Sequence, residues 1–329
     1  EGDLHADIER LGLTGRAHLL GFREDGLQYV RAFDIWTMPS LMEGLGLALL
    51  EGMSGRLPVI ASNGPAMLPL VQRCVDEHDA LIEAAGMGHL IKANGWIEVF
   101  RNQPAFSTAQ ADARALQPYG LRYEVLDGEQ LREREPSLSD QAVGGIHWLD
   151  PKTVSDPGAL TRGYAALFIK RGGRFIQGDA LTLKHFDGRW QVQTEQGPVN
   201  AEQAVIALGP QAPELFKPLG YRIPLAIKRG YHMHYSSLDD AQLQHSICDA
   251  QGGYVLAPMA QGIRLTTGIE FAKSSDQAND IQLSRCEALA RKLYPLGERL
   301  DPEPWLGRRP CLPDMRPVIG PAAHHPGLW

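Results

Sequence analysis

The sequence predicts a half-Rossmann α/β segment over residues 1–66, followed by an α+β domain over residues 67–329. Three observations support this fold class. Strand-like and helical stretches alternate up to about residue 61, which is typical of a parallel sheet. A loop cluster at Ser62–Pro65 then interrupts the alternation. Beyond a long helix, short strand patterns joined by turn signals dominate the remaining chain.

The first segment contains two buried-strand patterns, at Asp34–Pro39 and Leu57–Ala61, with a helical pattern at Gly46–Met53 between them. Pro39 ends the first strand because proline has no N–H to donate to a sheet. The strand–helix–strand order predicts that the two strands lie parallel.

Helices are predicted at three places in the second domain. Apolar residues recur at three- and four-residue steps over residues 68–85, and Gly86 is a suitable C-cap. Asp156 is an N-cap followed by proline at the first helical position, and Gly172 ends that helix. Residues 281–294 have a third helical pattern.

Strand patterns fill much of the second domain. Asp187-Gly188 between two of them is a hairpin signal, because both residues tolerate the left-handed backbone of a tight turn. The predicted strands are residues 95–101, 174–176, 180–186, 190–194, 204–208, 227–235, 253–256 and 262–269.

The composition narrows the class of protein. The chain has 329 residues, a net charge of −7 and 43% hydrophobic residues, as expected for a soluble globular protein without a nucleic-acid partner. No apolar run is long enough to span a membrane. The four cysteines, Cys74, Cys248, Cys286 and Cys311, form no C-x-x-C pair, so we expect a reducing, cytoplasmic location and no metal site.

Two carboxylates stand near the ends of the first predicted helix, Glu43 and Glu51. A helix N-terminus flanked by glycines can face a diphosphate, and a carboxylate can accept hydrogen bonds from ribose hydroxyls. An ordinary helix with acidic residues near both ends is the alternative.

The residues around these carboxylates form an ordered series, Met38–Leu47, Leu49–Met53 and Leu57–Ser62. The series resembles the nucleotide-sugar-binding lobe of retaining GT-B glycosyltransferases over about residues 11–64. The resemblance implies that Glu51 contacts the ribose and Glu43 the sugar. The acceptor-binding domain of that family has no counterpart in this sequence, so we expect no sugar transfer.

Four motifs follow one another in the second domain. Ala204–Gly209 is a buried-strand pattern ending in glycine, which lets backbone approach a bound dinucleotide closely. Ile227–His232 places cationic and aromatic groups on one strand, with a solvated sheet face as the alternative. Gly253–Pro258 leads into Arg264–Glu270. Trp305–Gly320 is rich in Pro, Gly and Arg, and predicts an ordered loop of the kind that carries functional residues.

In this order the motifs resemble the FAD-dependent D-amino acid oxidase superfamily, and most nearly bacterial D-amino acid dehydrogenases, over about residues 68–329. The resemblance implies an FAD oxidoreductase substrate domain, with FAD as the cofactor and a D-amino acid as the small-molecule substrate. The implied reaction is oxidative deamination, with hydride transfer from the substrate Cα to the flavin. The resemblance does not indicate the electron acceptor. It implies a peripheral association with the inner membrane as an alternative location.

The resemblance also implies site residues. Arg309, in Gly-Arg-Arg-Pro, matches the arginine that binds the substrate carboxylate, and its planar fork suits that group. Tyr254 matches a tyrosine whose hydroxyl helps to hold the same carboxylate, so we expect both side chains to face one site. Tyr231 and His232 are further pocket candidates. No catalytic acid or base is predicted, because the cofactor carries the electronic work.

The implied cofactor contacts are Ala207 and Gly209, at the end of a strand, together with Gly307 and Gly320. Enzymes of this class bind the FAD diphosphate with a Gly-x-Gly-x-x-Gly turn between a strand and a helix. The patterns at residues 44–46 and 86–88 lack the third glycine. We therefore expect an incomplete dinucleotide-binding layer. The sequence leaves open a non-catalytic chimera of two partial domains.

The missing glycine turn leads to a prediction about the cofactor. Tight FAD binding needs backbone N–H groups in a glycine turn at a helix N-terminus to meet the diphosphate charge. We expect the purified chain to carry substoichiometric flavin and to show no measurable D-amino acid dehydrogenase activity. Visible absorbance relative to protein concentration checks the flavin content. A yellow preparation with one flavin per chain would contradict the prediction.

Overall fold

The structure is a computed structural model that describes residues 9–10, 36–38, 59–61, 68–272, 276–312 and 318–329. The chain divides into two compact units, Glu1–Gly64 and Pro65–Trp329. In the first unit, β1 (Trp36–Met38) and β2 (Val59–Ala61) pair in parallel, as the strand–helix–strand pattern predicted. The helix predicted between them, at residues 46–53, lies outside the described residues.

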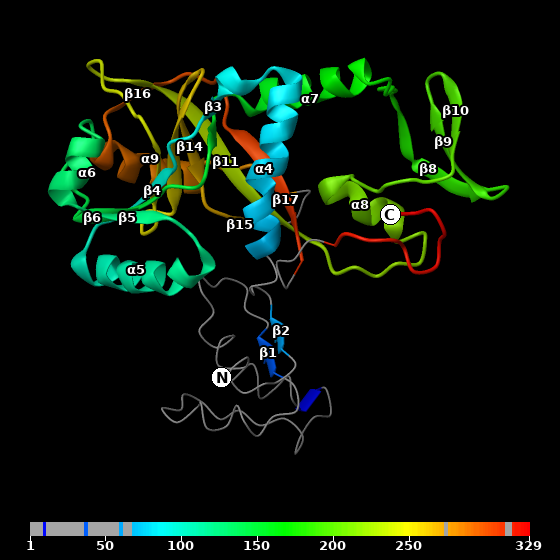
Figure 1. Ribbon diagram of the computed structural model, residues 1–329, viewed down its shortest axis with the longest axis horizontal. Helices are drawn as coiled ribbons and strands as arrows, with labels where there is room; N and C mark the ends of the chain where they lie inside the picture. Colours follow the sequence, from blue (N-terminus) through cyan, green and yellow to red (C-terminus); the bar gives the residue numbers. More distant parts are fainter. Residues whose placement is uncertain (1–8, 11–35, 39–58, 62–67, 273–275, 313–317) are drawn as a thin grey trace. The chain divides into compact units, whose positions relative to one another are not determined.

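The second unit is built on a ten-stranded sheet (Figure 1). Its strand order is β15-β11-β14-β13-β12-β4-β6-β5, and β16 and β17 also pair with β11. Only β12 and β4 pair in parallel within it. The strands are β4 (Trp96–Phe100), β5 (Tyr123–Asp127), β6 (Gly144–Trp148), β11 (Ala226–Ser237), β12 (Ser246–Asp249), β13 (Tyr254–Met259), β14 (Gly262–Thr267), β15 (Glu270–Phe271), β16 (Leu296–Arg299) and β17 (Trp305–Cys311).

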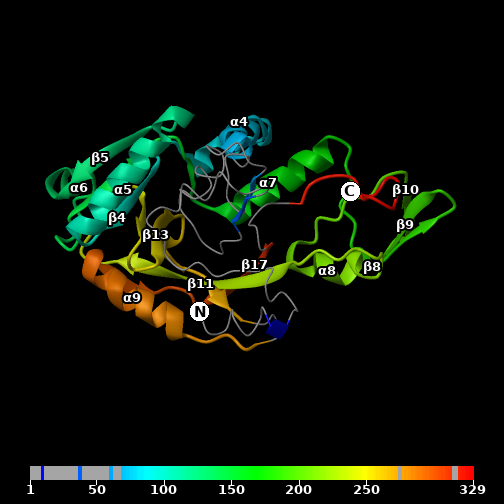
Figure 2. The same cartoon turned by 90° about the horizontal axis from the view of Figure 1, so that it is seen from below.

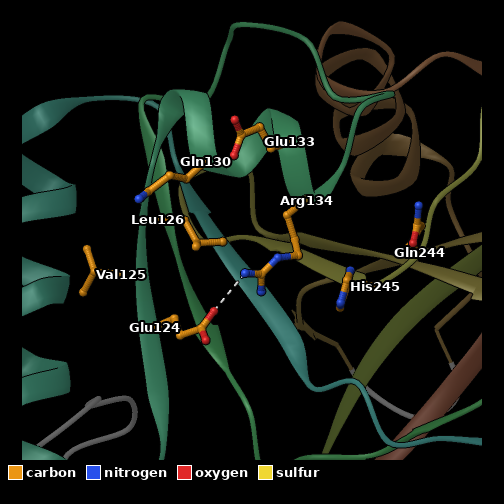
Figure 3. Close-up of a pocket in the computed structure, with 8 residues that line it drawn as sticks. All are labelled: Glu124, Val125, Leu126, Gln130, Glu133, Arg134, Gln244 and His245. Carbon is orange, nitrogen blue, oxygen red and sulfur yellow. Dashed lines mark hydrogen bonds and ion pairs between the residues drawn. The ribbon is translucent and has the colours of Figure 1, made fainter.

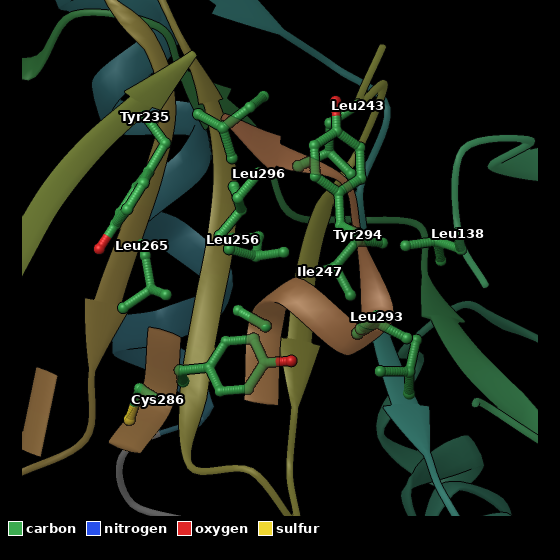
Figure 4. Packing of buried hydrophobic residues seen from close by; sticks show 14 of the residues in the cluster. Leu138, Tyr235, Leu243, Ile247, Leu256, Leu265, Cys286, Leu293, Tyr294 and Leu296 are labelled. Atoms are coloured by element: carbon green, nitrogen blue, oxygen red, sulfur yellow. The ribbon is translucent and has the colours of Figure 1, made fainter. Parts of the chain in front are cut away.

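One face of this sheet, here called the core face, packs against α6 (Gly128–Arg134) and α9 (Ile281–Leu293). Alternate residues of β11 point into it, because successive strand residues face opposite sides. Figure 4 shows the packing of aliphatic and aromatic side chains from β11–β14 against α9. The buried cluster includes Leu131, Tyr231, Met233, Tyr235, Tyr254, Leu256, Leu265, Leu283 and Leu293.

The opposite face, here called the outer face, carries Gly230, His232 and His234 of β11. At the β4–β6 end, α5 (Gln103–Leu116) covers it through a small cluster of Phe100, Phe106, Ala113 and Ile146. Figure 2 shows α5 and α9 on the two sides of the strands.

The helices follow the sequence signals. α4 (Leu68–Ala85) ends before Gly86, whose φ is +69°. α7 (Pro157–Lys170) begins at the predicted N-cap, where the Asp156 side chain accepts a hydrogen bond from Ala159 N at 2.8 Å. α4 and α7 pack on each other through Ile82, Leu90 and Leu160. None of the described helices is both long and apolar enough to cross a membrane.

A separate antiparallel sheet contains β8 (Gly178–Phe186), β9 (Arg189–Thr194) and β10 (Gly197–Ala201). The predicted hairpin turn joins β8 to β9, with positive φ at both Asp187 and Gly188. The short strands β3 (Ile91–Lys92) and β7 (Thr153–Val154) form a separate antiparallel pair. The short helix α8 spans Ala212–Phe216.

Two strand predictions were wrong. Residues 174–176 are not a strand, and Ala204–Leu208 forms only a parallel bridge between Ala204 and Leu328. The bridge is flanked by a hydrogen bond from Ile206 N to Trp329 O. Because few described residues pair with this segment, the ladder is too short to count as a strand, and Val205 is 73% exposed.

The prediction of a loop over Trp305–Gly320 was also wrong in its first part, because β17 occupies residues 305–311. β17 pairs antiparallel with β11 over seven positions. It has no other strand partner among the described residues, and a proline such as Pro310 is tolerated in such an edge position. Long-range pairing with β11 therefore outweighs the poor local strand propensity.

Candidate functional site

The candidate site lies on the outer face, where β17 runs beside β11. The register places Arg309 opposite Lys228, Gly307 opposite Gly230, and Trp305 opposite His232. Residues in register on paired strands point to the same face of a sheet. Arg309 and His232, two of the predicted substrate-binding residues, therefore share this face.

Two glycines, Gly230 and Gly307, lie at the centre of this site and are here called its floor. A Cβ at Gly230 would lie 3.5 Å from the Arg309 Nη1 atom and 3.0 Å from the Gly268 carbonyl oxygen. A Cβ at Gly307 would collide with the ring of Trp305. The missing side chains thus let a guanidinium and an indole lie close to the strand backbone.

Trp305 and His232 form the wall at one end of the floor. Their rings stack with centroids 4.6 Å apart and an interplanar angle of 20°. Trp305 is still 59% exposed, so this stacked pair presents an apolar surface that a ligand can contact.

Arg309 is the charged group at the other end. Its side chain is exposed, and it makes no hydrogen bond or ion pair with any described residue. A guanidinium in this state can bind a carboxylate with two parallel hydrogen bonds. Lys228 adds positive charge on the same face, and its ammonium lies 5.6 Å from the centre of the Phe271 ring.

His232 is held in its neutral form. Burial is the main cause of its lowered pKa, which is about 4, and the charges of Arg264 and His234 lower it further. At neutral pH the imidazole therefore adds no charge to the site and keeps one donor and one acceptor nitrogen.

Tyr254, expected to share a site with Arg309, lies on the other face of the sheet. Tyr254 is in register with Thr267, whereas Val255 is in register with Thr266, which in turn pairs with His232. Tyr254 therefore points to the core face, opposite to Arg309, and is only 2% exposed. The neighbour that shares a face with Arg309 is Val255.

The Tyr254 hydroxyl belongs to a buried polar cluster. It accepts a hydrogen bond from Arg101 Nη2 at 3.2 Å, and Arg101 forms an ion pair with Asp249 at 2.6 Å. Burial, followed by the charge of Asp249, raises the pKa of Tyr254. The tyrosine therefore stays protonated and structural.

Tyr231 is also on the core face. Its hydroxyl donates to Glu270 Oε2 at 2.9 Å, and the same carboxylate pairs with Arg229 at 2.7 Å. Strand alternation is the signal that distinguishes these residues. Tyr231 stands between Gly230 and His232, so Tyr231 and His232 cannot face the same pocket.

The predicted cofactor residues lie on an open stretch of backbone. Ala207 is exposed, and Gly209 has φ of +55°. A Cβ at Gly209 or at Gly320 would meet no atom within 4 Å. This open backbone fits the close approach of a dinucleotide, while Gly307 belongs instead to the floor of the outer-face site.

A pocket lies on the core-face side of the edge strand β5, next to α6 (Figure 3). Its volume is about 670 Å³. Two of its lining residues have carboxylate partners: Arg134 lies 3.0 Å from Glu124, and His245 lies 2.6 Å from Glu135. The lining residues are Glu124, Val125, Leu126, Gln130, Glu133, Arg134, Gln244 and His245.

Comparison with known proteins identifies the family. A family model described as FAD dependent oxidoreductase matches residues 40–329. A D-amino acid dehydrogenase of Rhizobium johnstonii is 34% identical over 247 residues, which are 72% of this chain and 58% of that protein. A D-amino acid dehydrogenase of Vibrio cholerae is 27% identical over 298 residues, which are 86% of this chain and 68% of that protein. The chain thus spans little more than half the length of the first relative.

Solved structures share the fold. Glycine oxidase from Geobacillus kaustophilus has a TM-score of 0.69 and 20% identity, covering 82% of this chain and 74% of that chain. L-proline dehydrogenase from P. horikoshii has a TM-score of 0.66 and 17% identity, covering 78% and 70%. The predicted mixed fold of an FAD oxidoreductase is therefore confirmed, although Tyr254 and Arg309 lie on opposite faces.

The glycosyltransferase resemblance receives no support from these comparisons. The FAD-oxidoreductase match begins at residue 40, inside the segment that was expected to resemble a glycosyltransferase. Glu43 and Glu51 lie outside the described residues, and no function is proposed for them.

The core position of Tyr254 is testable. In Tyr254→Phe the hydroxyl is lost from the Arg101–Asp249 cluster, and we expect a loss of stability of about 1–3 kcal/mol because a buried polar group loses its partner. Urea unfolding measures this. Binding of D-alanine, measured by calorimetry, should not change. Tenfold weaker binding of D-alanine at unchanged stability would instead indicate that Tyr254 contacts the substrate.

The neutral state of His232 predicts a pH dependence. His232 titrates at about 4 in the folded chain and at about 6.5 when unfolded. Below about pH 6.5 the unfolded chain takes up a proton that the folded chain excludes, so stability falls as the pH approaches 4. His232→Gln removes this proton. We expect the urea midpoint of the variant to rise relative to that of the wild type as the pH falls from 7 to 5. A difference independent of pH would contradict a neutral His232.

Proposed function

Because the chain belongs to the FAD-dependent oxidoreductase family, we propose that it takes part in the oxidative deamination of D-amino acids. FAD is the cofactor of this family. The names of the relatives support a D-amino acid as the substrate class. The observation that carries the proposal is the guanidinium of Arg309, which lies over Gly230 and makes no hydrogen bond or ion pair with any described residue.

The outer-face residues have separate roles in this proposal. Arg309 binds the substrate α-carboxylate through its planar fork, which fixes two points of the substrate rather than one. The Trp305–His232 stack lies beside it and excludes water from one side of the substrate. FAD, when bound, supplies the acceptor of the substrate hydride, and Ala207 and Gly209 are the residues proposed to contact it.

The described residues need no acid–base pair for this role. Arg309 gives this face a positive charge, which disfavours a protonated substrate amine near it. Neutral His232 adds no opposing charge. A neutral amine is the form from which a hydride can leave the adjacent carbon. The site therefore favours the reactive form by electrostatics.

The alternative is a non-catalytic chimera of two partial domains. In such a chimera Arg309 would have no ligand to bind. Carboxylate binding separates the two possibilities, because it depends on the outer face and not on a complete cofactor layer. Saturable binding of D-alanine that requires Arg309 supports the proposed function.

Arg309→Lys tests the carboxylate anchor. Lysine keeps the charge but loses the bidentate fork, at a cost of roughly 1.5–3 kcal/mol for the lost charge-assisted hydrogen bond. We expect the Kd for D-alanine to rise about ten- to a hundred-fold by calorimetry.

Arg308→Lys is the matched control, since Arg308 pairs with Arg229 in the register and points to the other face. It should bind D-alanine like the wild type. Equal affinity of wild type and Arg309→Lys would remove Arg309 from the site.

A further inference from the structure

A second arginine with no hydrogen-bond or ion-pair partner among the described residues lies on the outer face. Arg264 is in register with His234 of β11 and with Ala257 of β13, so its side chain shares the face of His232. Its Nε atom is buried and has no hydrogen-bond partner. No ion pair joins its guanidinium to any described residue.

The arginines of the core face differ from Arg264 in having ion-pair partners. Each buried or half-buried arginine there has a carboxylate partner: Arg101 with Asp249 at 2.6 Å, Arg229 with Glu270 at 2.7 Å and Arg299 with Glu287 at 2.6 Å. A buried charge without a partner is costly, so Arg264 is an exception that the fold itself does not explain.

The carboxylate that reaches this end of the outer face is already bound. Asp301 Oδ2 accepts hydrogen bonds from the backbone N and from Nδ1 of His234, each at 2.8 Å. Burial alone lowers the pKa of Arg264, with no carboxylate acting against it. Arg264 thus retains its capacity to bind an anion.

The position of Arg264 relates it to the candidate site. Its charge acts on His232, which lies between His234 and Gly230 along β11. Gly230 is the residue over which the Arg309 guanidinium lies. A strand rises about 3.3 Å per residue, so Gly230 and His234 are about 13 Å apart along the strand. His232 therefore lies between the two arginines along β11, on the face that they share.

We propose that Arg264 binds the side-chain carboxylate of an acidic D-amino acid whose α-carboxylate is held by Arg309. This inference rests on the proposed function and narrows its substrate class. An acidic substrate offers one carboxylate to each arginine, whereas a substrate such as alanine has only one to offer. Arg264 thereby determines specificity and takes no part in the chemistry.

The test compares two ligands that differ at one end. Glutarate carries both carboxylates and butyrate only one. Their binding to the purified chain, with FAD added, is measured by calorimetry for the wild type, Arg264→Gln and Arg309→Lys. We expect glutarate to bind the wild type about ten- to a hundred-fold more tightly than butyrate. Arg264→Gln should abolish this preference and leave butyrate affinity unchanged.

The outcomes separate the two proposals. If butyrate binding depends on Arg309 but glutarate has no advantage, the inference about Arg264 fails and the proposed function stands. If neither ligand binds the wild type, or if Arg309→Lys changes neither affinity, both fail. Inorganic phosphate that binds as tightly as glutarate through Arg264 also overturns the carboxylate assignment.

Stability provides an independent readout. Removing a buried charge that has no partner should leave the urea midpoint of Arg264→Gln unchanged or raised in the absence of ligand. Arg299→Gln is the matched comparison, because it breaks an ion pair at 2.6 Å with Glu287 and should lower the midpoint. A strongly lowered midpoint for Arg264→Gln would show a structural role and overturn the proposal.

Discussion

The alternation of side chains along β11 is the constraint on which the rest of the second unit depends. This 12-residue strand pairs with β14, β15, β16 and β17. One set of its side chains, including Tyr231 and Met233, enters the core with α9, and the other, including Gly230 and His232, forms the outer face. A shift of one residue in register would exchange the two sets, so core packing and the candidate site are specified together.

The sequence predicted the elements that carry local signals. α7 begins at Asp156 because its side chain satisfies an N–H of the first turn, and the β8–β9 hairpin turns at Asp187-Gly188, where both residues adopt positive φ. The failures depend on distant partners. β17 is a strand because β11 lies beside it, whereas residues 204–208 read as a strand but have too few partners among the described residues. The local sequence pattern indicates neither the pairing of β17 nor the lack of partners for residues 204–208.

The candidate site was predicted only in part for the same reason. Arg309 was implied by the family resemblance and His232 was a further pocket candidate, and the register places both on one face. Tyr254 was named by resemblance alone, although it shares a strand face with the apolar Leu256, two residues further on, and this spacing indicates a core position. Arg264 was missed as a site residue because an arginine in a strand has no distinctive spacing, and only the finished fold shows that it has no partner.

The two faces of the sheet place the same kind of side chain in opposite energetic situations. On the core face, carboxylates such as Asp249 and Glu270 neutralise buried arginines, and hydroxyls such as that of Tyr231 complete their hydrogen bonds. On the outer face, Arg264 and Arg309 have no such partner among the described residues. Departures from satisfied burial tend to mark functional sites, because a fold that only needed stability would pair or remove these charges. The distribution of unpaired cations therefore carries information about the ligand that family membership alone does not contain.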